Sequence, residues 1–490
     1  MSEARALPRS VVVAGGGLVA VLAAVALRRA LPATQVTVVV TPAEPAAFAD
    51  HASSASPHGV RLLEKFGMAE ADILSRCGGS HRLVTRYADW SGEGAQAVVA
   101  YGSATDPALA SAFVRDWGGG RRGASTDAPP ASLAEVLAQA GRFAAEQFDP
   151  ANPPGNPLPG VEYALRWNAP ALRDLVIAQA QAVGVQHRMA RTGALRLDES
   201  GDALALALAL DGQGEIAADL FVDCTGPAAA LLAQMPGAAR IDWSAFLPVR
   251  QVLCAAPGQP VLALEDRVTL TPAGWLIEST GRDGLHRVLG LTEGAGETQV
   301  MAALGGAPVA RAVGFVPGRA KESWIGNVVA LGDAAALFEP LGNLNLDCAL
   351  RQLDLLLELL PGLDIAEGER AEFNRRANLL ADGARDLVAA HYAAPRAAAL
   401  FDPLSHSPEL ELALDQFTRR GRSPFFEEWP ITEQERAALF AAVGIPRGAP
   451  AVSPPPNPQA ERILAAKAQA ALQATPPYQQ WLASVVKPVR

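Results

Sequence analysis

The stretch Val11-Val12-Val13-Ala14-Gly15-Gly16-Gly17-Leu18-Val19-Ala20 decides the fold, because it joins a β-branched run, a glycine turn and an apolar segment. The valines favour a buried strand over residues 11–14, and the apolar residues that follow predict a helix over 18–30. Leu31-Pro32 ends that helix because proline disfavours a helical residue before it. Residues 35–40 predict a second strand. This βαβ order predicts a parallel sheet covered on both faces.

The same stretch fits G-x-G-x-x-G/A, a dinucleotide-binding pattern. Gly15 permits the tight turn, Gly17 lets the backbone approach a pyrophosphate, and Ala20 lets helix and strand pack closely. The pyrophosphate would then lie on the helix N-terminus. The alternative is a glycine-rich turn without a ligand. An acid normally ends the second strand and binds the adenosine ribose, but here the strand ends at Val40 and the nearest acid is Glu44.

Two later strand ends favour a flavin over a nicotinamide. One strand ends at Asp223, with Gly226 just beyond it, and another runs into Gly332 and Asp333. An aspartate at such a strand end can accept a hydrogen bond from a ribityl hydroxyl, and a neighbouring glycine allows close approach to the flavin chain. The alternative is that Asp333 is a plain helix N-cap.

Composition narrows the class of protein. The chain has 490 residues and a net charge of −10, so nucleic acid is an unexpected partner. Four scattered cysteines fit a reducing, cytoplasmic compartment, and the histidine spacing gives no support for a metal site.

Residues 11–27 carry no charge and could form a signal peptide or a short membrane anchor. The three glycines favour a buried strand, turn and helix instead.

Other elements are expected from periodicity and composition. Helices are predicted over residues 170–182, 347–360, 371–390 and 459–472, and strands over 195–197, 203–210, 221–224 and 328–331. Glycine- or proline-rich irregular stretches are predicted over 116–132 and 149–160, and an extended stretch at the prolines 454–456.

Five segments occur in an order found in one known family. They are Arg29-Ala30-Leu31-Pro32 after the glycine turn, Phe221-Val222-Asp223-Cys224-Thr225-Gly226, Trp243-Ser244-Ala245-Phe246-Leu247-Pro248, residues 324–341 with Phe338-Glu339-Pro340-Leu341, and Phe373-Asn374-Arg375-Arg376 followed by His391-Tyr392. From residue 11 to about 392 the chain resembles the flavin-dependent tryptophan halogenases. The resemblance implies an α/β fold with an FAD-binding, Rossmann-like parallel sheet, an interleaved antiparallel substrate sheet and a helical C-terminal region.

The resemblance also implies a domain plan and a chemistry. Residues 1–395 would form the FAD-binding module, with the substrate region roughly at 91–160 and 240–315, and 396–490 a helical cap with a proline-rich tail. In the family, reduced FAD from a separate reductase forms a hydroperoxide with oxygen, and halide attacks it. The hypohalous acid reaches a lysine near the substrate, and a glutamate assists at the aromatic ring. Asn345 and Leu346 would lie against the flavin.

The chain departs from the family at the catalytic positions. The lysine position falls on Arg82 and the glutamate position on Gly342, and Asn343-Leu344-Asn345 replaces the family's halide-binding Ser-Thr-Gly. Only Trp275 remains of a paired tryptophan motif, and residues 51–56 share nothing with the family's flavin-side loop. A guanidinium stays protonated and is a poor nucleophile, so arginine does not replace the lysine amine.

Three hypotheses remain open. The first is an FAD-dependent oxidoreductase that uses reduced flavin and oxygen on an aromatic substrate or a peptide. The second is an atypical halogenase, for which Lys65 and Lys321 are the nearby amines. The third is a flavin-binding or partner-binding pseudoenzyme. His81 could act as an acid or base beside Arg82 or be a structural residue. A separate flavin reductase and a homodimer are expected, and no halogenation of free tryptophan.

Overall fold

The computed structural model describes residues 6–101, 132–145, 161–198, 204–402, 405–448 and 458–486. Most of the irregular stretches predicted over 116–132 and 149–160, and the three prolines at 454–456, lie outside the described residues.

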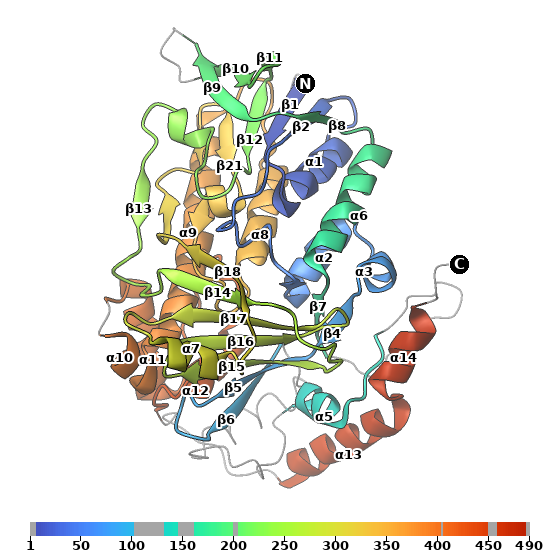
Figure 1. Cartoon of the computed structure of the whole chain (residues 1–490), viewed down its shortest axis with the longest axis vertical. Helices are drawn as coiled ribbons and strands as arrows, with labels where there is room; N and C mark the ends of the chain where they lie inside the picture. Colours follow the sequence, from blue (N-terminus) through green and yellow to red (C-terminus); the bar gives the residue numbers. More distant parts are fainter. Residues whose placement is uncertain are drawn as a thin grey trace.

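A six-stranded sheet forms one end of the molecule (Figure 1). Its order is β20-β21-β12-β1-β2-β8, and all neighbours are parallel except β20 with β21. The strands are β1 (Ser10–Ala14), β2 (Gln35–Val40), β8 (Gln186–Met189), β12 (Leu220–Asp223), β20 (Trp324–Ile325) and β21 (Val328–Ala330). The predicted Rossmann-like parallel sheet is therefore confirmed, and β2 has the predicted bounds.

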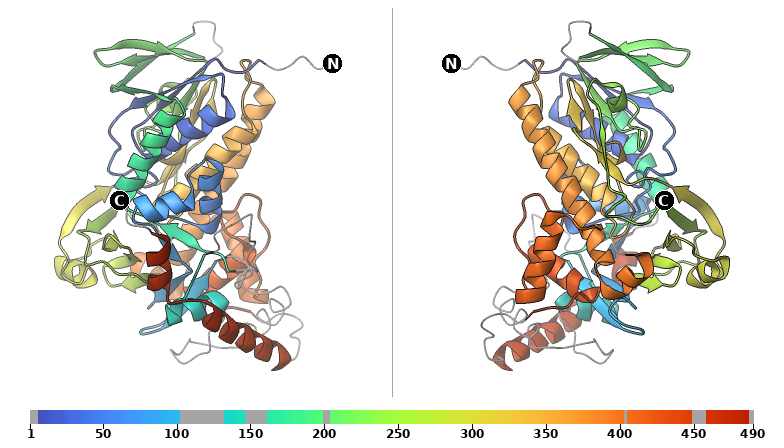
Figure 2. Two further views of the ribbon diagram at one scale, coloured as in Figure 1. Left: turned by 90° about the vertical axis from the view of Figure 1, so that its right-hand side faces the viewer. Right: turned by 90° about the vertical axis from the view of Figure 1, so that its left-hand side faces the viewer.

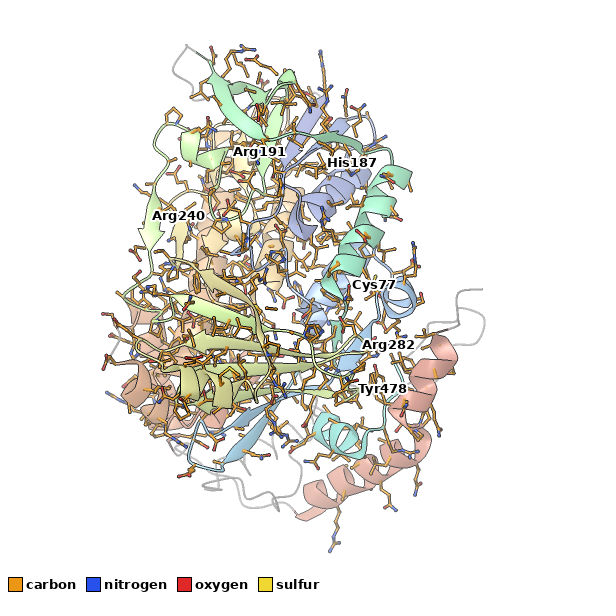
Figure 3. All side chains as sticks on the ribbon, in the orientation of Figure 1. Cys77, His187, Arg191, Arg240, Arg282 and Tyr478 are labelled. Atoms are coloured by element: carbon orange, nitrogen blue, oxygen red, sulfur yellow. The ribbon has the colours of Figure 1, made fainter. Side chains whose placement is uncertain are left out.

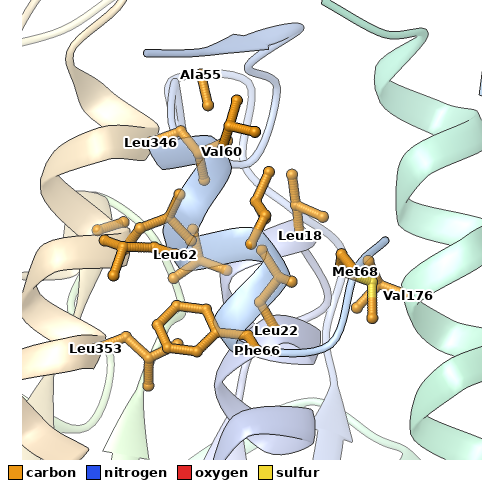
Figure 4. Packing of buried hydrophobic residues seen from close by; sticks show 14 of the residues in the cluster. Leu18, Leu22, Ala55, Val60, Leu62, Phe66, Met68, Val176, Leu346 and Leu353 are labelled. Carbon is orange, nitrogen blue, oxygen red and sulfur yellow. The ribbon is translucent and has the colours of Figure 1, made fainter. Parts of the chain in front are cut away.

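Helix α1 (Leu18–Ala30) also has the predicted bounds, and residues 18–27 are all buried. It packs against α2 (Pro57–Lys65), α6 (Ala169–Ala182) and α8 (Asn345–Glu358), with Leu22, Phe66 and Leu353 among the contacts in Figure 4. Burying one such side chain stabilises the fold by about 1.5–3 kcal/mol. The uncharged residues 11–27 are thus part of the hydrophobic core. Within the described residues, no helix is both long and apolar enough to cross a membrane.

A seven-stranded sheet lies across the other end of the molecule (Figure 1). Its order is β18-β14-β17-β16-β15-β5-β6, and every pair is antiparallel except β15 with β5. The strands are β5 (Val84–Ala88), β6 (Gln96–Ala100), β14 (Gln251–Ala255), β15 (Glu265–Thr271), β16 (Gly274–Thr280), β17 (Leu285–Leu291) and β18 (Val309–Gly314). Segments far apart in sequence therefore build this sheet, which confirms the predicted interleaving.

Three smaller sheets connect these parts. Their orders are β3-β7-β4, β11-β10-β9 and β13-β19-β22. The strands are β3 (Ser54–Ala55), β4 (Ser80–Arg82), β7 (Ala164–Arg166), β9 (Thr192–Leu197), β10 (Ala205–Leu210), β11 (Gly214–Ala217), β13 (Arg240–Asp242), β19 (Gly318–Ala320) and β22 (Ala336–Leu337). The shorter helices are α3 (Glu70–Arg76), α5 (Leu133–Ala140), α7 (Glu297–Ala303), η1 (Leu232–Gln234) and η2 (Gly332–Ala334).

The C-terminal helices pack in two places. Helices α9 (Glu367–Tyr392), α10 (Pro395–Phe401), α11 (Pro408–Arg420) and α12 (Glu433–Ala442) share a core cluster with the seven-stranded sheet. Helices α13 (Pro458–Ala474) and α14 (Tyr478–Val485) lie instead beside α5, and both views of Figure 2 show α13 apart from α9.

Two predicted helices begin at least two residues later than the observed ones. Helix α9 starts at Glu367, not at residue 371, and α8 starts at Asn345, not at 347. The first turn of α9 lacks apolar periodicity, but Glu367 and Glu369 favour a helix N-terminus because they oppose its dipole.

Candidate flavin and active site

Three strand ends meet at one edge of the six-stranded sheet. Cys224 N–H donates to the Ala14 carbonyl at 2.8 Å, and Leu331 N–H donates to the Asp223 carbonyl at 2.9 Å. The glycine turn after β1, Asp223 at the end of β12 and Gly332 after β21 therefore lie together, as the βαβ prediction requires. Such a strand edge is where open α/β sheets bind ligands.

Side chains are disfavoured both at Gly15 in the glycine turn and at Gly332 after β21. A Cβ on Gly15, whose φ is +142°, would lie 2.3 Å from the Cys224 carbonyl oxygen and 3.0 Å from the Ala20 Cβ. A Cβ on Gly332, whose φ is +63°, would lie 3.3 Å from the Val19 side chain. A side chain at Gly15 would therefore collide with the backbone after β12, and one at Gly332 would press on Val19 of α1.

The N-terminus of α1 points its first backbone N–H groups into this edge. Its N-cap, Gly17, supplies no side-chain acceptor. Arg173 on α6 donates from Nε to the Gly16 carbonyl at 2.8 Å and places a positive charge beside the turn. Both features suit a pyrophosphate. Arg173 was not predicted, because nothing in the sequence pairs α6 with the turn.

Asp333 keeps one carboxylate oxygen free of protein partners. Its Oδ2 accepts a hydrogen bond from Ala49 N–H at 2.8 Å, whereas the buried Oδ1 has no partner among the described residues. Burial, and to a lesser degree the charge of Asp50, raises the pKa of Asp333 well above its usual range. A buried acceptor without a donor fits the predicted ribityl hydroxyl. Asp333 lies inside η2 and its carboxylate accepts from Ala49 on another segment, so its geometry is not that of a plain helix N-cap.

Asp223, also predicted to contact the cofactor, has both oxygens engaged within the protein. Oδ1 accepts from the backbone and hydroxyl of Thr225, and Oδ2 accepts from Leu231 and Leu232 N–H, each at 2.8 Å. Asp223 thus holds the loop after β12, and its contact with the cofactor stays a prediction. Gly226, with φ +85°, lies in that loop, where a Cβ would be 3.3 Å from the Ala47 Cβ.

Residues 41–52, which we call the covering segment, cross over the glycine turn. The Thr41 carbonyl oxygen lies 1.7 Å from where a Gly16 Cβ would be, and the Asp50 carboxylate lies 1.9 Å from the corresponding position at Gly17. Asp50 Oδ1 accepts a hydrogen bond from Val19 N–H at 2.9 Å. An acid therefore already occupies the helix N-terminus to which phosphate would bind.

Asp50 is buried at this position. Burial outweighs the Val19 hydrogen bond and the charge of Arg173, and raises the pKa of Asp50 to about 6. No sequence pattern predicts this contact, because the covering segment shares no motif with a known flavin loop. The residues around the turn, Arg173 and Asp333 fit FAD, provided that Asp50 moves away from α1.

Asn345 and Leu346, predicted beside the flavin, are both buried. Asn345 Nδ2 donates to the Phe338 carbonyl at 2.8 Å and holds the loop before α8. Leu346 belongs to the apolar cluster around α1 (Figure 4). Their side chains stabilise the wall of the candidate flavin site.

Arg82 is fixed in a buried ion-pair network. Its Nη1 lies 2.6 Å from Asp266 Oδ2, and Arg166 Nη1 lies 2.8 Å from Asp266 Oδ1. The guanidinium of Arg82 also lies over the Tyr101 ring, 5.5 Å from its centroid. Burial alone would lower the pKa of Arg82, but Tyr101 and the Asp266 carboxylate outweigh it and raise the pKa further above its ordinary value. Arg82 is thus a permanent cation.

Gly342 lies in a tight turn that disfavours any side chain. Its φ is +84° and that of Asn343 is +56°, and Asn343 N–H donates to the Pro340 carbonyl at 3.0 Å. Non-glycine residues pay a steric cost in this left-handed region. The position therefore carries no base, and its backbone does not readily accept one.

Comparison with known proteins identifies the family. The family model described as tryptophan halogenase matches residues 10–447. This chain belongs to the tryptophan halogenase family. It is 28% identical over 245 residues to the 7-chloro-L-tryptophan 6-halogenase of Kutzneria sp. (strain 744), which is 47% of this chain and 46% of that relative. The matched region thus spans about half the length of that relative.

Two solved structures share the fold over nearly the whole chain. A flavin-dependent halogenase from Xanthomonas campestris superposes with a TM-score of 0.83 and 23% identity, covering 98% of each chain. The flavin-dependent halogenase BrvH from Brevundimonas sp. BAL3 gives 0.82 and 23%, covering 98% of this chain and 99% of the other. Flavin-dependent halogenases use FAD, which is the cofactor that Asp333 and the turn fit.

Two of the other residues considered in this tryptophan halogenase family member, His81 and Lys65, have structural partners. His81 is buried, with Nε2 2.9 Å from Glu70 Oε1 and Nδ1 2.9 Å from the Tyr478 hydroxyl, and burial lowers its pKa. Lys65 pairs with Asp354, and Lys321 is exposed. Among the described residues, neither the Lys65 amine nor the Lys321 amine contacts Arg82.

Glu339 is a buried carboxyl to which the sequence analysis assigns no role. The Tyr392 hydroxyl donates to its Oε1 and accepts from Trp275 Nε1 at 2.8 Å, and its Oε2 has no partner among the described residues. Burial raises the pKa of Glu339 well above its usual range. It comes three residues before Gly342 and is buried against Tyr392, which belongs with Trp275 to the core cluster of the seven-stranded sheet.

Proposed function

We propose that this chain is an FAD-dependent oxidoreductase that uses reduced flavin and oxygen on an aromatic substrate, without halogenating free tryptophan. The observation that carries the proposal is the ion pair between Arg82 and Asp266 at the family's lysine position. A separate flavin reductase, a cytoplasmic location and a homodimer belong to the same proposal.

The N-terminus of α1, with Arg173 beside it, would hold the pyrophosphate of FAD, and Asp333 Oδ1 would accept from the ribityl chain. When bound, reduced FAD supplies the electrons that activate oxygen. The chain's own part is to bind and orient the cofactor and to keep water from the enclosed strand edge. Val40 offers no acceptor for the adenosine ribose, which favours weak binding.

The catalytic positions support oxidation without halogenation. Arg82 can donate hydrogen bonds but cannot give up a proton at any working pH. Gly342 offers no acceptor for the proton that leaves an aromatic ring during halogenation. One observation favours the pseudoenzyme alternative: Asp50 occupies the N-terminus of α1, so flavin binding must displace it.

The test is an incubation with FAD, a flavin reductase, NADH, oxygen and bromide, followed by mass spectrometry of tryptophan and simple indoles. We expect no bromotryptophan above the no-enzyme control, either from the native chain or from Arg82→Lys, because the base is absent in both. A hydroxylated indole, or hydrogen peroxide that depends on the protein, supports the oxidoreductase. Bromotryptophan would sink the proposal, and no difference from reductase alone would favour the pseudoenzyme.

A further inference from the structure

A row of polar side chains crosses the small β3-β7-β4 sheet on one face. Ser54 and Ser80 both pair with Arg166, from opposite sides. Paired residues of neighbouring strands point to the same face, and so does Arg82, two residues beyond Ser80. All four side chains are buried. Figure 3 labels Cys77, Arg282 and Tyr478 around this corner of the molecule.

Each member of this row has a polar atom without a hydrogen-bond partner among the described residues. They are the hydroxyl oxygens of Ser54 and Ser80 and the Nε atoms of Arg82 and Arg166. A buried polar atom that is left without a hydrogen-bond partner destabilises the fold. Four buried polar atoms without hydrogen-bond partners on one face of a three-stranded sheet indicate that a ligand binds there.

Two of these groups, Ser80 and Arg166, line one small pocket, whose walls include Trp167, Thr280 and His286. Arg166 has already committed its terminal nitrogens: Nη1 to Asp266 and Thr280, and Nη2 to backbone carbonyls. Its remaining donor is Nε–H. The residues that line the pocket thus include one with an unmet guanidinium N–H and one with an unmet hydroxyl, and the pocket has room for about one water-sized particle.

The carboxylates nearby do not turn this into a cation site. Both Asp266 oxygens are held by arginines, and both Asp283 oxygens, at the pocket rim, accept hydrogen bonds from Asn168 and His286. The unmet Nε–H is a donor only, and the hydroxyl can turn to donate as well. An acceptor that carries negative charge satisfies both better than a cation does.

We propose that this pocket binds a single small monoanion of the halide class between Ser80 Oγ and Arg166 Nε. The site is built by β4 and β7 and not by the flavin edge of the six-stranded sheet, so it does not rest on the proposed function. The anion completes the hydrogen bonding of Arg166, which also binds Asp266, the partner of Arg82. Anion binding therefore stabilises the network at the family's lysine position.

The test is chloride-35 NMR of the flavin-free protein, titrated with sodium chloride. We expect excess line broadening that bromide reverses by competition. Ser80→Ala should weaken binding about tenfold, because a hydrogen bond to the ion is lost. Ser54→Ala is the matched control: the same residue type in the same row, outside the pocket lining, should leave the broadening unchanged.

Bromide-soaked crystals provide a second readout that needs no variant. An anomalous peak within contact distance of Ser80 Oγ and Arg166 Nε supports the site. The proposal is overturned if that position holds only a water, if Ser80→Ala broadens chloride as the native chain does, or if Ser54→Ala loses as much binding as Ser80→Ala.

Discussion

The Asp50 carboxylate accepts a hydrogen bond from the backbone N–H of Val19 at 2.9 Å, across 31 residues of sequence. It thereby closes the N-terminus of α1, to which a dinucleotide phosphate would bind. Ala49 N–H donates to Asp333 on the other side of the same segment. The covering segment is therefore hydrogen-bonded both to the N-terminus of α1 and to Asp333, and FAD binding must break the bond to α1.

This fastening makes FAD affinity depend on pH. The pKa of Asp50 is raised to about 6 while it is buried, so the covering segment is held best when Asp50 is protonated. Expelling Asp50 into water returns its pKa to an ordinary value and releases the proton. FAD affinity should therefore rise about tenfold between pH 5 and pH 7.5. Fluorescence titration of FAD across this range measures it.

Asp50→Asn imitates the protonated acid and should abolish that dependence. At pH 7.5 it should bind FAD more weakly than the native chain does, whereas the exposed Asp211→Asn should behave like the native chain. If Asp50→Asn binds FAD more tightly, or if the native affinity does not change with pH, then Asp50 does not hold the covering segment in this way.

The same group predicts a pH dependence of stability without flavin. A carboxyl with a raised pKa binds more protons folded than unfolded, so its contribution to stability is present at low pH. That contribution is lost as pH rises from about 4 to about 6. Relative to Asp50→Asn, the native chain should lose on the order of 3 kcal/mol across this window, at about 1.4 kcal/mol per pKa unit.

Urea unfolding of both chains at pH 4.5 and pH 7.5 measures this difference. Asp347 and Asp386, whose pKa values are also raised to about 6, titrate in both chains and cancel. A difference in unfolding free energy that is the same at both pH values would contradict the burial of Asp50.

The two strand-end aspartates should separate cofactor binding from stability. Asp333→Asn replaces one carboxyl oxygen by an NH2 group, which cannot accept from a ribityl hydroxyl, so FAD binding should weaken about tenfold. Little stability should be lost, because the amide oxygen can still accept from Ala49 N–H. Asp223→Asn disrupts hydrogen bonds from Thr225, Leu231 and Leu232 and should lower the free energy of unfolding by about 2–4 kcal/mol. Thermal unfolding and FAD titration of both variants provide the comparison. Equal effects on both readouts would mean that Asp333 is structural too.

Gly342 should resist restoration of the family's glutamate. Because its φ is +84°, Gly342→Ala and Gly342→Glu should each lower stability by about 1–2 kcal/mol. Gly368→Ala is the control: it lies in α9 with open space around it and should be neutral or slightly stabilising. If urea unfolding shows Gly342→Ala to be as stable as the native chain, backbone strain does not exclude a side chain there.

The sequence by itself determined the βαβ opening and the meeting of its strand ends. The bounds of α1 and β2 follow from local causes: a β-branched run, glycines that permit the turn, and a proline that ends the helix. Parallel strands of one sheet end at the same edge, so Gly15 and Gly332 had to lie near each other once both strands were recognised. The family's motifs, and their loss at Arg82 and Gly342, are also local in sequence.

Only the tertiary structure decided which partner each buried polar side chain takes. Arg82 and Asp266 are 184 residues apart, and Arg166 and Asp266 are 100 apart. Asp223 and Asp333 look alike as strand ends, yet one is fully engaged and the other keeps an oxygen free. Hydrogen-bond partners depend on how distant loops and strands pack, and no local propensity specifies that packing. The same is true of Asp50, whose contact with α1 exists only because the covering segment folds back over the turn.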